Sequence, residues 1–174
     1  TQGFLVSGDT AGISYSKEDY MGLRPLPLYA MALENVAVPA TARLGPDFDI
    51  KRTLSLGRIA TAALAVGTCQ AVLDYVIPYV NERIAFGEPI SNRQAVAFMV
   101  ADMATEIEGL RLMVYRAAAQ AEQGLDCTRI AFLAHRNAVR YGMKIGTDGV
   151  QLLGGHGFTR EHPVEMWYRN LRAL

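Results

Sequence analysis

Apolar residues recur every three or four positions after residue 50, which is the period of a helix with one buried face. The first series predicts a helix from about Leu54 to Arg83, with Ile59, Ala63, Val66, Gln70, Leu73, Ile77 and Val80 on one face. The second predicts a helix ending at Gly124, with Val96, Val100, Met103, Ile107, Leu110 and Val114 on one face. The third predicts a helix from near Thr128, with Val139, Met143, Gly146, Val150 and Leu153 on its stripe.

Turn and capping residues mark the ends of these helices. Residues 86–89 break the first helix, and Ser91 followed by Gln94 has the spacing of a capping box that opens the second. The third helix stops at the Gly-Gly-His-Gly run of residues 154–157, and a short fourth helix begins after Pro163. Long helices with apolar seams and short connections predict a mainly α fold built on an antiparallel four-helix bundle.

The first fifty residues follow a different pattern. They hold four of the seven prolines, together with short β-favouring runs at residues 4–6, 13–15, 29–33 and 36–38. These runs predict a piece of antiparallel sheet. Strands this short have too little apolar surface to stand alone, so we expect them to belong to a sheet whose other strands lie outside this sequence.

Composition narrows the classes of protein that the sequence can represent. The 174 residues are 51% hydrophobic and 20% charged, which is enough to bury a core. Lys and Arg number 17, as do Asp and Glu, so the zero net charge argues against a nucleic-acid partner. The apolar stretch at residues 59–73 is too short for a membrane span. The sequence starts at Thr1 and still reads as helix in its last six residues, so we expect a chain cut at both ends.

Metal and nucleophile motifs are missing from the sequence. None of the three histidines follows a carboxylate at the Glu-x-x-His spacing of bundle metal sites, so no metal ligand is predicted. No serine lies in a Gly-x-Ser-x-Gly elbow, which leaves hydrolase chemistry unsupported. Cys69 and Cys127 have no metal-ligand spacing, and we interpret them as two buried, reduced thiols of an intracellular protein.

The glycine run at residues 154–157 has two interpretations. It is typical of a helix C-cap and turn, but bare backbone also allows a close approach to a diphosphate. It follows a predicted helix rather than a strand, so it is not a Rossmann fingerprint. Arg83 and Arg93 flank the break at residues 86–89, where they are either phosphate ligands or solvated helix ends. The residues alone leave both questions open.

An ordered set of motifs resembles the acyl-CoA dehydrogenases over essentially the whole sequence. The motifs are Gly22-Leu23-Arg24, residues 34–39, residues 83–90 with Gln94, residues 101–103, residues 151–158 and Tyr168-Arg169. The family has an N-terminal helical domain, a middle β-domain and a C-terminal four-helix bundle. The resemblance therefore implies that residues 1–50 are the end of the middle β-domain. It implies that residues 51–174 are the C-terminal helical bundle, truncated before its end.

The resemblance also implies an FAD cofactor shared across a dimer, in which the bundle of one subunit reaches the adenosine diphosphate part of its neighbour's FAD. By position, Arg83 meets the pyrophosphate and Phe86 packs near the adenine end. Ala85 falls where some members carry a hydroxyl group. The implied cofactor-binding residues are Arg83, Ala85, Phe86, Arg93, Gln94, Gln151, Leu152, Leu153, Gly154 and Gly155.

The family's reaction is α,β-dehydrogenation of an acyl-CoA thioester, in which a carboxylate removes the α-proton and a hydride leaves the β-carbon for the flavin. In most members this carboxylate would fall about four residues past Leu174. In a minority it precedes the arginine that matches Arg58, and here that position is Gly57, which cannot take a proton. No catalytic residue is therefore assigned in this sequence. Arg58 is the expected substrate-binding residue, close to the catalytic carboxylate and thioester.

The implied partners are an acyl-CoA substrate, electron-transfer flavoprotein or a similar acceptor, and further subunits. The subunits would form a homodimer, a homotetramer, or a hetero-oligomer with a homologous chain. The expected location is the bacterial cytoplasm or the mitochondrial matrix. Two alternatives stay open: a flavin oxidase or monooxygenase of the same fold, and a non-catalytic structural subunit that lacks the base.

Overall fold

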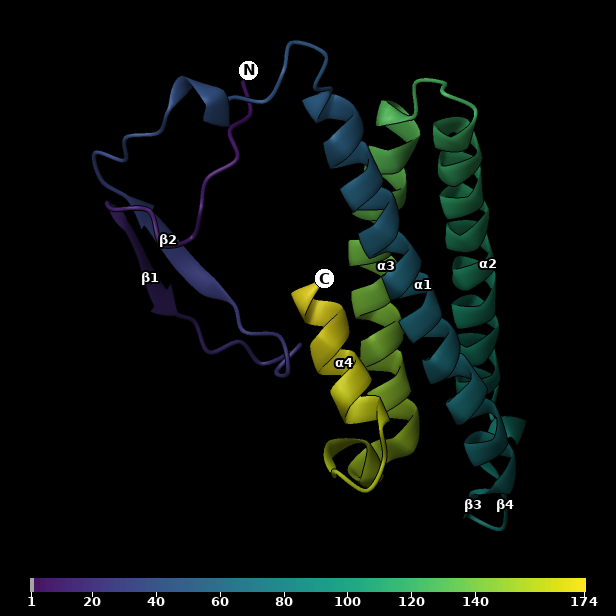
Figure 1. The fold of residues 1–174 in the computed structure, drawn as a ribbon. Coiled ribbons are helices and arrows are strands. Elements are labelled where there is room, and N and C mark those ends of the chain that lie inside the picture. Colours follow the sequence, from purple (N-terminus) through teal and green to yellow (C-terminus); the bar gives the residue numbers. More distant parts are fainter. Residues whose placement is uncertain (1) are drawn as a thin grey trace.

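A computed structural model describes residues 2–174, and four helices dominate it (Figure 1). They are α1 (Ile50–Glu82), α2 (Gln94–Glu122), α3 (Thr128–Leu153) and α4 (Val164–Ala173). Successive helices run in opposite directions, and α3 packs against each of the other three. The predicted mainly α fold with an antiparallel four-helix bundle is confirmed.

Helix α1 begins at Ile50, one turn before the expected start near Leu54. The reason is local, because the Asp49 carboxylate accepts a hydrogen bond from the backbone N–H of Arg52 at 2.9 Å and caps the first turn. The Arg52 guanidinium then donates to the carbonyl of Ala121 at 2.8 Å, near the end of α2. The polar residues at the start of α1 therefore cap α1 itself and form a hydrogen bond to the end of α2.

The core lies where α1, α2 and α3 face one another. On α2 the predicted face is confirmed, with Met103, Ile107, Leu110 and Val114 buried. The stripes on α1 and α3 are partly wrong, because Ala63, Ile77 and Val139 are exposed. Small residues occupy much of the buried face of α3, including Ala131, Ala134, Ala138, Gly142, Gly146 and Gly149. Small side chains let α1 and α4 approach α3 closely, so its buried face is not its most hydrophobic one.

Both cysteines are free and buried, in agreement with the interpretation of reduced thiols. Burial in the core, with a smaller contribution from the nearby Glu106 carboxylate, raises the pKa of the Cys69 thiol to about 12. A thiol with such a pKa stays protonated at neutral pH and packs as a small apolar side chain.

Helix α1 is long and apolar enough, by length and composition, to cross a membrane. The apolar stretch at residues 59–73 is shorter than this helix, so it gave too low an estimate of the apolar length. Ala62, Cys69, Val72 and Val76 on α1 are fully buried against the other helices, and a central bundle helix has the same composition as a membrane span. The absence of a membrane span stays a prediction.

The N-terminal part of the described chain holds a two-stranded antiparallel sheet of β1 (Ile13–Lys17) and β2 (Tyr29–Leu33), with Tyr15 opposite Met31. The strands expected at residues 4–6 and 36–38 are wrong. Phe4 makes only an isolated bridge to Arg43, and residues 36–38 are irregular. Met31 and Leu33 are 58% and 60% exposed. Both strands of the sheet are largely exposed, and the expectation that they pack against structure outside this sequence stays a prediction.

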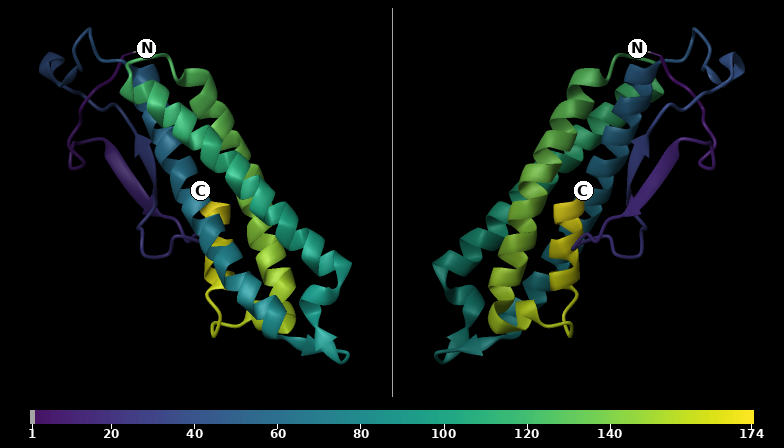
Figure 2. Two further views of the ribbon diagram at one scale, coloured as in Figure 1. Left: turned by 90° about the vertical axis from the view of Figure 1, so that its right-hand side faces the viewer. Right: turned by 90° about the vertical axis from the view of Figure 1, so that its left-hand side faces the viewer.

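The connection between β1 and β2 attaches the sheet to α4 (Figure 2). The Leu23 backbone N–H donates to the Asn170 side-chain oxygen at 2.8 Å, and the Arg169 guanidinium donates to the Met21 carbonyl at 3.0 Å. Gly22 lies between them, and a Cβ there would overlap the Arg169 carbonyl oxygen. Only glycine allows the two backbones to meet this closely.

Candidate functional site

A pocket of about 530 Å³ opens at the end of the bundle where α1 ends and α2 begins. A hairpin of β3 (Ile84–Ala85) and β4 (Glu88–Pro89) forms one wall, and the turn after α3 (Gly154–Phe158) forms another. Nine of the ten predicted cofactor-binding residues line it: Arg83, Ala85, Phe86, Arg93, Gln151, Leu152, Leu153, Gly154 and Gly155. Segments about seventy residues apart in sequence therefore meet in one cavity.

The β3–β4 hairpin turns through Phe86 and Gly87, whose φ angles are 56° and 88°. Positive φ at both central residues gives the tight turn that suits a two-residue hairpin, yet a bulky aromatic side chain is an outlier in that conformation. Phe86 is 94% exposed, and the Arg93 guanidinium lies over its ring at 5.0 Å from the centroid. The Phe86 ring and the Arg93 guanidinium are therefore exposed to solvent together, and a planar ligand can stack on the ring.

The start of α2 has free backbone donors. The expected capping box is wrong, because Ser91 lies in a short 3₁₀ helix (Ile90–Asn92) and Arg93 precedes α2 with no side-chain cap. The first N–H groups of α2 therefore have no side-chain acceptor, and Ala95 and Val96 line the pocket beside them. An uncapped helix N-terminus attracts anions, through its N–H groups and its helix dipole.

The two arginines make the pocket electropositive. Arg93 lies 3.6 Å from the Glu88 carboxylate, and both side chains are 44% exposed, so this ion pair is weak. Within residues 2–174 the exposed Arg83 side chain has no ion-pair or hydrogen-bond partner. Arg83 therefore keeps its full donor capacity for a ligand such as a phosphate.

Gly154 shapes the opposite wall. Its φ and ψ of 58° and −133° belong to a region that side chains other than glycine's avoid, and α3 ends there. A Cβ on Gly154 would meet nothing within 4 Å, so the backbone conformation, rather than crowding, requires glycine here. Both interpretations of the glycine run are compatible with this geometry, because the turn ends α3 and also lines the pocket.

The pocket includes residues that the sequence analysis missed, chiefly Tyr79 and His156. The Tyr79 hydroxyl donates to the Leu153 carbonyl at 3.3 Å and lies 2.9 Å from Nδ1 of His156. One signal could have found Tyr79, because it lies four residues before Arg83 and so on the same face of α1. The apolar floor, from Ile90, Val96 and Met99, gave no such signal.

Two predicted site residues lie apart from this pocket. Gln94 is exposed at the first position of α2 and does not line the cavity. Arg58 is 25 residues before Arg83 on α1, which places it about 37 Å away at 1.5 Å per residue. It lies over the Phe132 ring of α3, 5.5 Å from the centroid.

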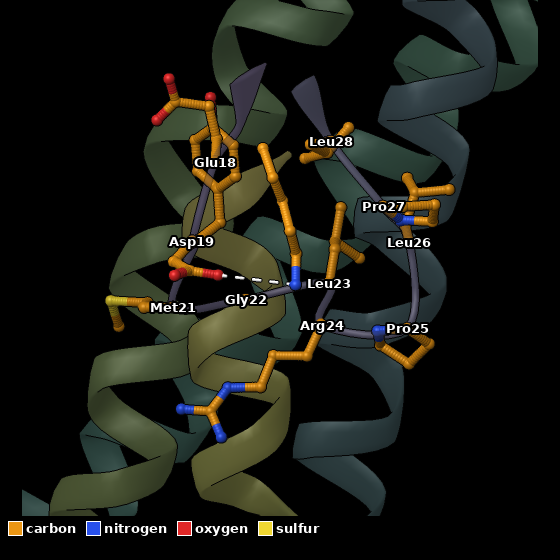
Figure 3. A pocket seen from close by; sticks show the side chains of 12 residues that line it. Glu18, Asp19, Met21, Gly22, Leu23, Arg24, Pro25, Leu26, Pro27 and Leu28 are labelled. Carbon is orange, nitrogen blue, oxygen red and sulfur yellow. Dashed lines mark ion pairs between the residues drawn. The ribbon is translucent and has the colours of Figure 1, made fainter. Parts of the chain in front are cut away.

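A second cavity, of about 680 Å³, is lined by residues 17–28 of the β1–β2 connection (Figure 3). Lys17 pairs with Asp19 at 3.9 Å, and Arg24 points to the opposite side of the loop from Glu18. One exposed loop with scattered charges presents no convergent set of polar groups. Among residues 2–174, no group of three or more His, Cys, Asp or Glu side chains could hold a metal ion. The pocket at the end of the bundle is the candidate site.

Comparisons with known proteins agree on one family. The short-chain specific acyl-CoA dehydrogenase of Megasphaera elsdenii is 36% identical over 174 residues, covering 97% of this chain and 45% of that protein. The CarC subunit of the caffeyl-CoA reductase-Etf complex of Acetobacterium woodii is 36% identical over 176 residues, with 98% and 46% covered. The structure of Megasphaera elsdenii butyryl-CoA dehydrogenase has a TM-score of 0.87 and 35% identity, covering 99% of this chain and 46% of that one.

The chain therefore spans about half the length of the relatives that it matches. Residues 49–174 match the family model described as the acyl-CoA dehydrogenase C-terminal domain. That match covers the whole bundle and more than half of the chain. On these grounds the chain belongs to the acyl-CoA dehydrogenase family.

Proposed function

We propose that this chain carries the C-terminal domain of a flavin-dependent acyl-CoA dehydrogenase. We also propose that its end-of-bundle pocket holds the adenosine diphosphate part of the FAD bound by a neighbouring subunit. One observation carries the proposal: nine residues chosen from the sequence for this role line a single cavity. Its volume of about 530 Å³ lies within the ordinary range of small-molecule sites.

The residues in this pocket fit a diphosphate joined to a planar base. Arg83 is an exposed cation with no partner among residues 2–174, and the start of α2, which has no side-chain cap, adds backbone donors beside it. Phe86 offers an exposed ring face with Arg93 behind it, where a nucleobase can stack. Bound FAD would supply the hydride acceptor for the acyl chain.

The remaining parts of the reaction are proposed on the family alone. Arg58, partly buried against Phe132, would lie near the acyl-CoA thioester. Position 57 is glycine, so no proton transfer is assigned there. The Acetobacterium woodii relative is named as a subunit of an Etf complex, which supports electron-transfer flavoprotein as the redox partner. A dimer or tetramer follows from the proposal that the pocket serves a neighbour.

The test is the redox behaviour of the intact protein. We expect it to purify with the absorbance bands of FAD, which an acyl-CoA thioester bleaches under anaerobic conditions. We expect the reduced flavin to reoxidise slowly in air and rapidly with electron-transfer flavoprotein. Stopped-flow absorbance measures both rates.

Each contrary result favours one of the alternatives. Rapid reoxidation in air contradicts the dehydrogenase assignment and favours an oxidase or a monooxygenase. Bound FAD that no acyl-CoA can bleach favours a structural subunit without its own chemistry. A protein that neither contains nor binds FAD contradicts the proposal as a whole.

A further inference from the structure

The turn after α3 is held by a single side chain from another helix. Tyr79 lies on α1, one helical turn before Arg83, whose backbone N–H donates to the Tyr79 carbonyl at 2.9 Å. Its hydroxyl reaches across to the turn, donating to the Leu153 carbonyl at 3.3 Å and lying 2.9 Å from His156 Nδ1. One oxygen atom thus contacts both the start and the middle of the glycine-rich segment.

The proton arrangement in this group follows from counting donors. The hydroxyl has one proton, so in the arrangement where it donates to the Leu153 carbonyl its oxygen accepts from an N–H at His156 Nδ1, and the tautomer of His156 sets the direction of that second bond. The Leu153 carbonyl is among the last four of α3, which have no partner within the helix. Tyr79 therefore adds a side-chain donor at the carbonyl of Leu153, the residue where α3 ends and the 3₁₀ helix Gly154–Phe158 begins.

We propose that Tyr79 is a positioning residue for the cofactor pocket, because its hydroxyl holds the turn of residues 153–157 in the shape that lines the cavity. The inference rests on the proposed function, since it concerns the same FAD site. Gly154 adopts a conformation that few residues can hold, and a glycine-rich segment has many other conformations available. Without the hydroxyl, the turn exchanges among them, and its backbone is no longer preorganised for the ligand.

Tyr75 provides a matched control on the same helix. It lies one turn before Tyr79, and its hydroxyl is 2.7 Å from Nδ1 of His162. Its ring also packs edge-on against Trp167 of α4. His162 lies beyond the glycine turn, and neither it nor Tyr75 lines the pocket. Tyr75→Phe and Tyr79→Phe therefore each remove one hydroxyl bonded to a histidine, but only the second hydroxyl contacts the turn.

The experiment compares the two variants in the intact protein. In Tyr79→Phe we expect the dissociation constant for FAD to rise about three- to tenfold, the effect of one neutral hydrogen bond. Without FAD, the amides of residues 154–159 should exchange with deuterium several-fold faster. In Tyr75→Phe we expect neither change, although the two variants should lose similar thermal stability. His156→Phe, in the exposed turn, should also speed amide exchange without FAD.

Each possible outcome decides between the claims. Unchanged FAD affinity and exchange in Tyr79→Phe overturn the positioning role, and if Arg83→Ala still weakens FAD binding, the proposed function stands. Equal weakening in both tyrosine variants also overturns it, because a general loosening of the bundle then explains the loss. If neither Tyr79→Phe nor Arg83→Ala affects FAD affinity, the pocket assignment fails together with the inference.

Discussion

Replacing Arg83 by alanine in the intact protein is expected to lower its affinity for FAD by about 10- to 150-fold, since a charge-assisted hydrogen bond contributes about 1.5–3 kcal/mol. The fold should be unaffected, because this exposed side chain makes no hydrogen bond or ion pair within residues 2–174. Titration of the apoprotein with FAD, followed by flavin fluorescence, measures the affinity.

Two further variants locate the source of this effect. Arg83→Lys keeps the charge but loses the planar fork, so its FAD affinity should fall between those of the native protein and Arg83→Ala. Arg116 is an exposed arginine further along α2 that does not line the pocket, and Arg116→Ala should bind FAD normally. Equal losses in Arg83→Ala and Arg116→Ala would indicate a general effect of charge and contradict a specific contact.

Replacing Ile107 by alanine is expected to lower the free energy of unfolding by about 2–5 kcal/mol. Ile107 is fully buried near the middle of α2, where the helix packs against both α1 and α3. Truncation loses the transfer free energy of the side chain and leaves a cavity that rigid helices cannot close. Denaturant unfolding, read as a change in midpoint at constant slope, measures the loss.

Ile107→Val should cost only about 0.5–1.5 kcal/mol, because it removes a single methyl group. Leu112 lies on the same helix and is 66% exposed, so Leu112→Ala should change the stability by less than about 0.5 kcal/mol. If Leu112→Ala costs as much as Ile107→Ala, the assigned core face of α2 is wrong.

Helical periodicity predicted the bundle well where large residues carry the pattern. On α2 the four-three spacing identified Met103, Ile107, Leu110 and Val114, which are all large and buried. On α3 the pattern misled, because Ala134 and Ala138 are buried between helices while the larger Val139 is 40% exposed. Hydrophobicity ranks residues by size, whereas close helix packing requires small ones.

The candidate site also contains residues that the sequence predicted and residues that it did not. The resemblance to the family assigned Arg83, Phe86 and Gly154 to one site, and the structure places all three in one pocket. No pattern of residue spacing connects them. The capping box failed because the 3₁₀ turn of Ile90–Asn92 takes up Ser91, with the Arg93 N–H bonded to the Ile90 carbonyl at 3.1 Å. Tyr79 was missed because its partner Leu153 is 74 residues away, and pairings at that distance leave no trace in spacing.

Hydrogen exchange of the intact protein with and without FAD tests the central claim most directly, because it locates the cofactor on this chain. The proposed site predicts slower exchange on FAD binding at residues 84–95 and 151–158, the two segments that contain most of the residues lining the pocket. It predicts no change at residues 123–127, which connect α2 to α3 at the opposite end of the bundle. FAD binding that leaves both wall segments unprotected would contradict the account.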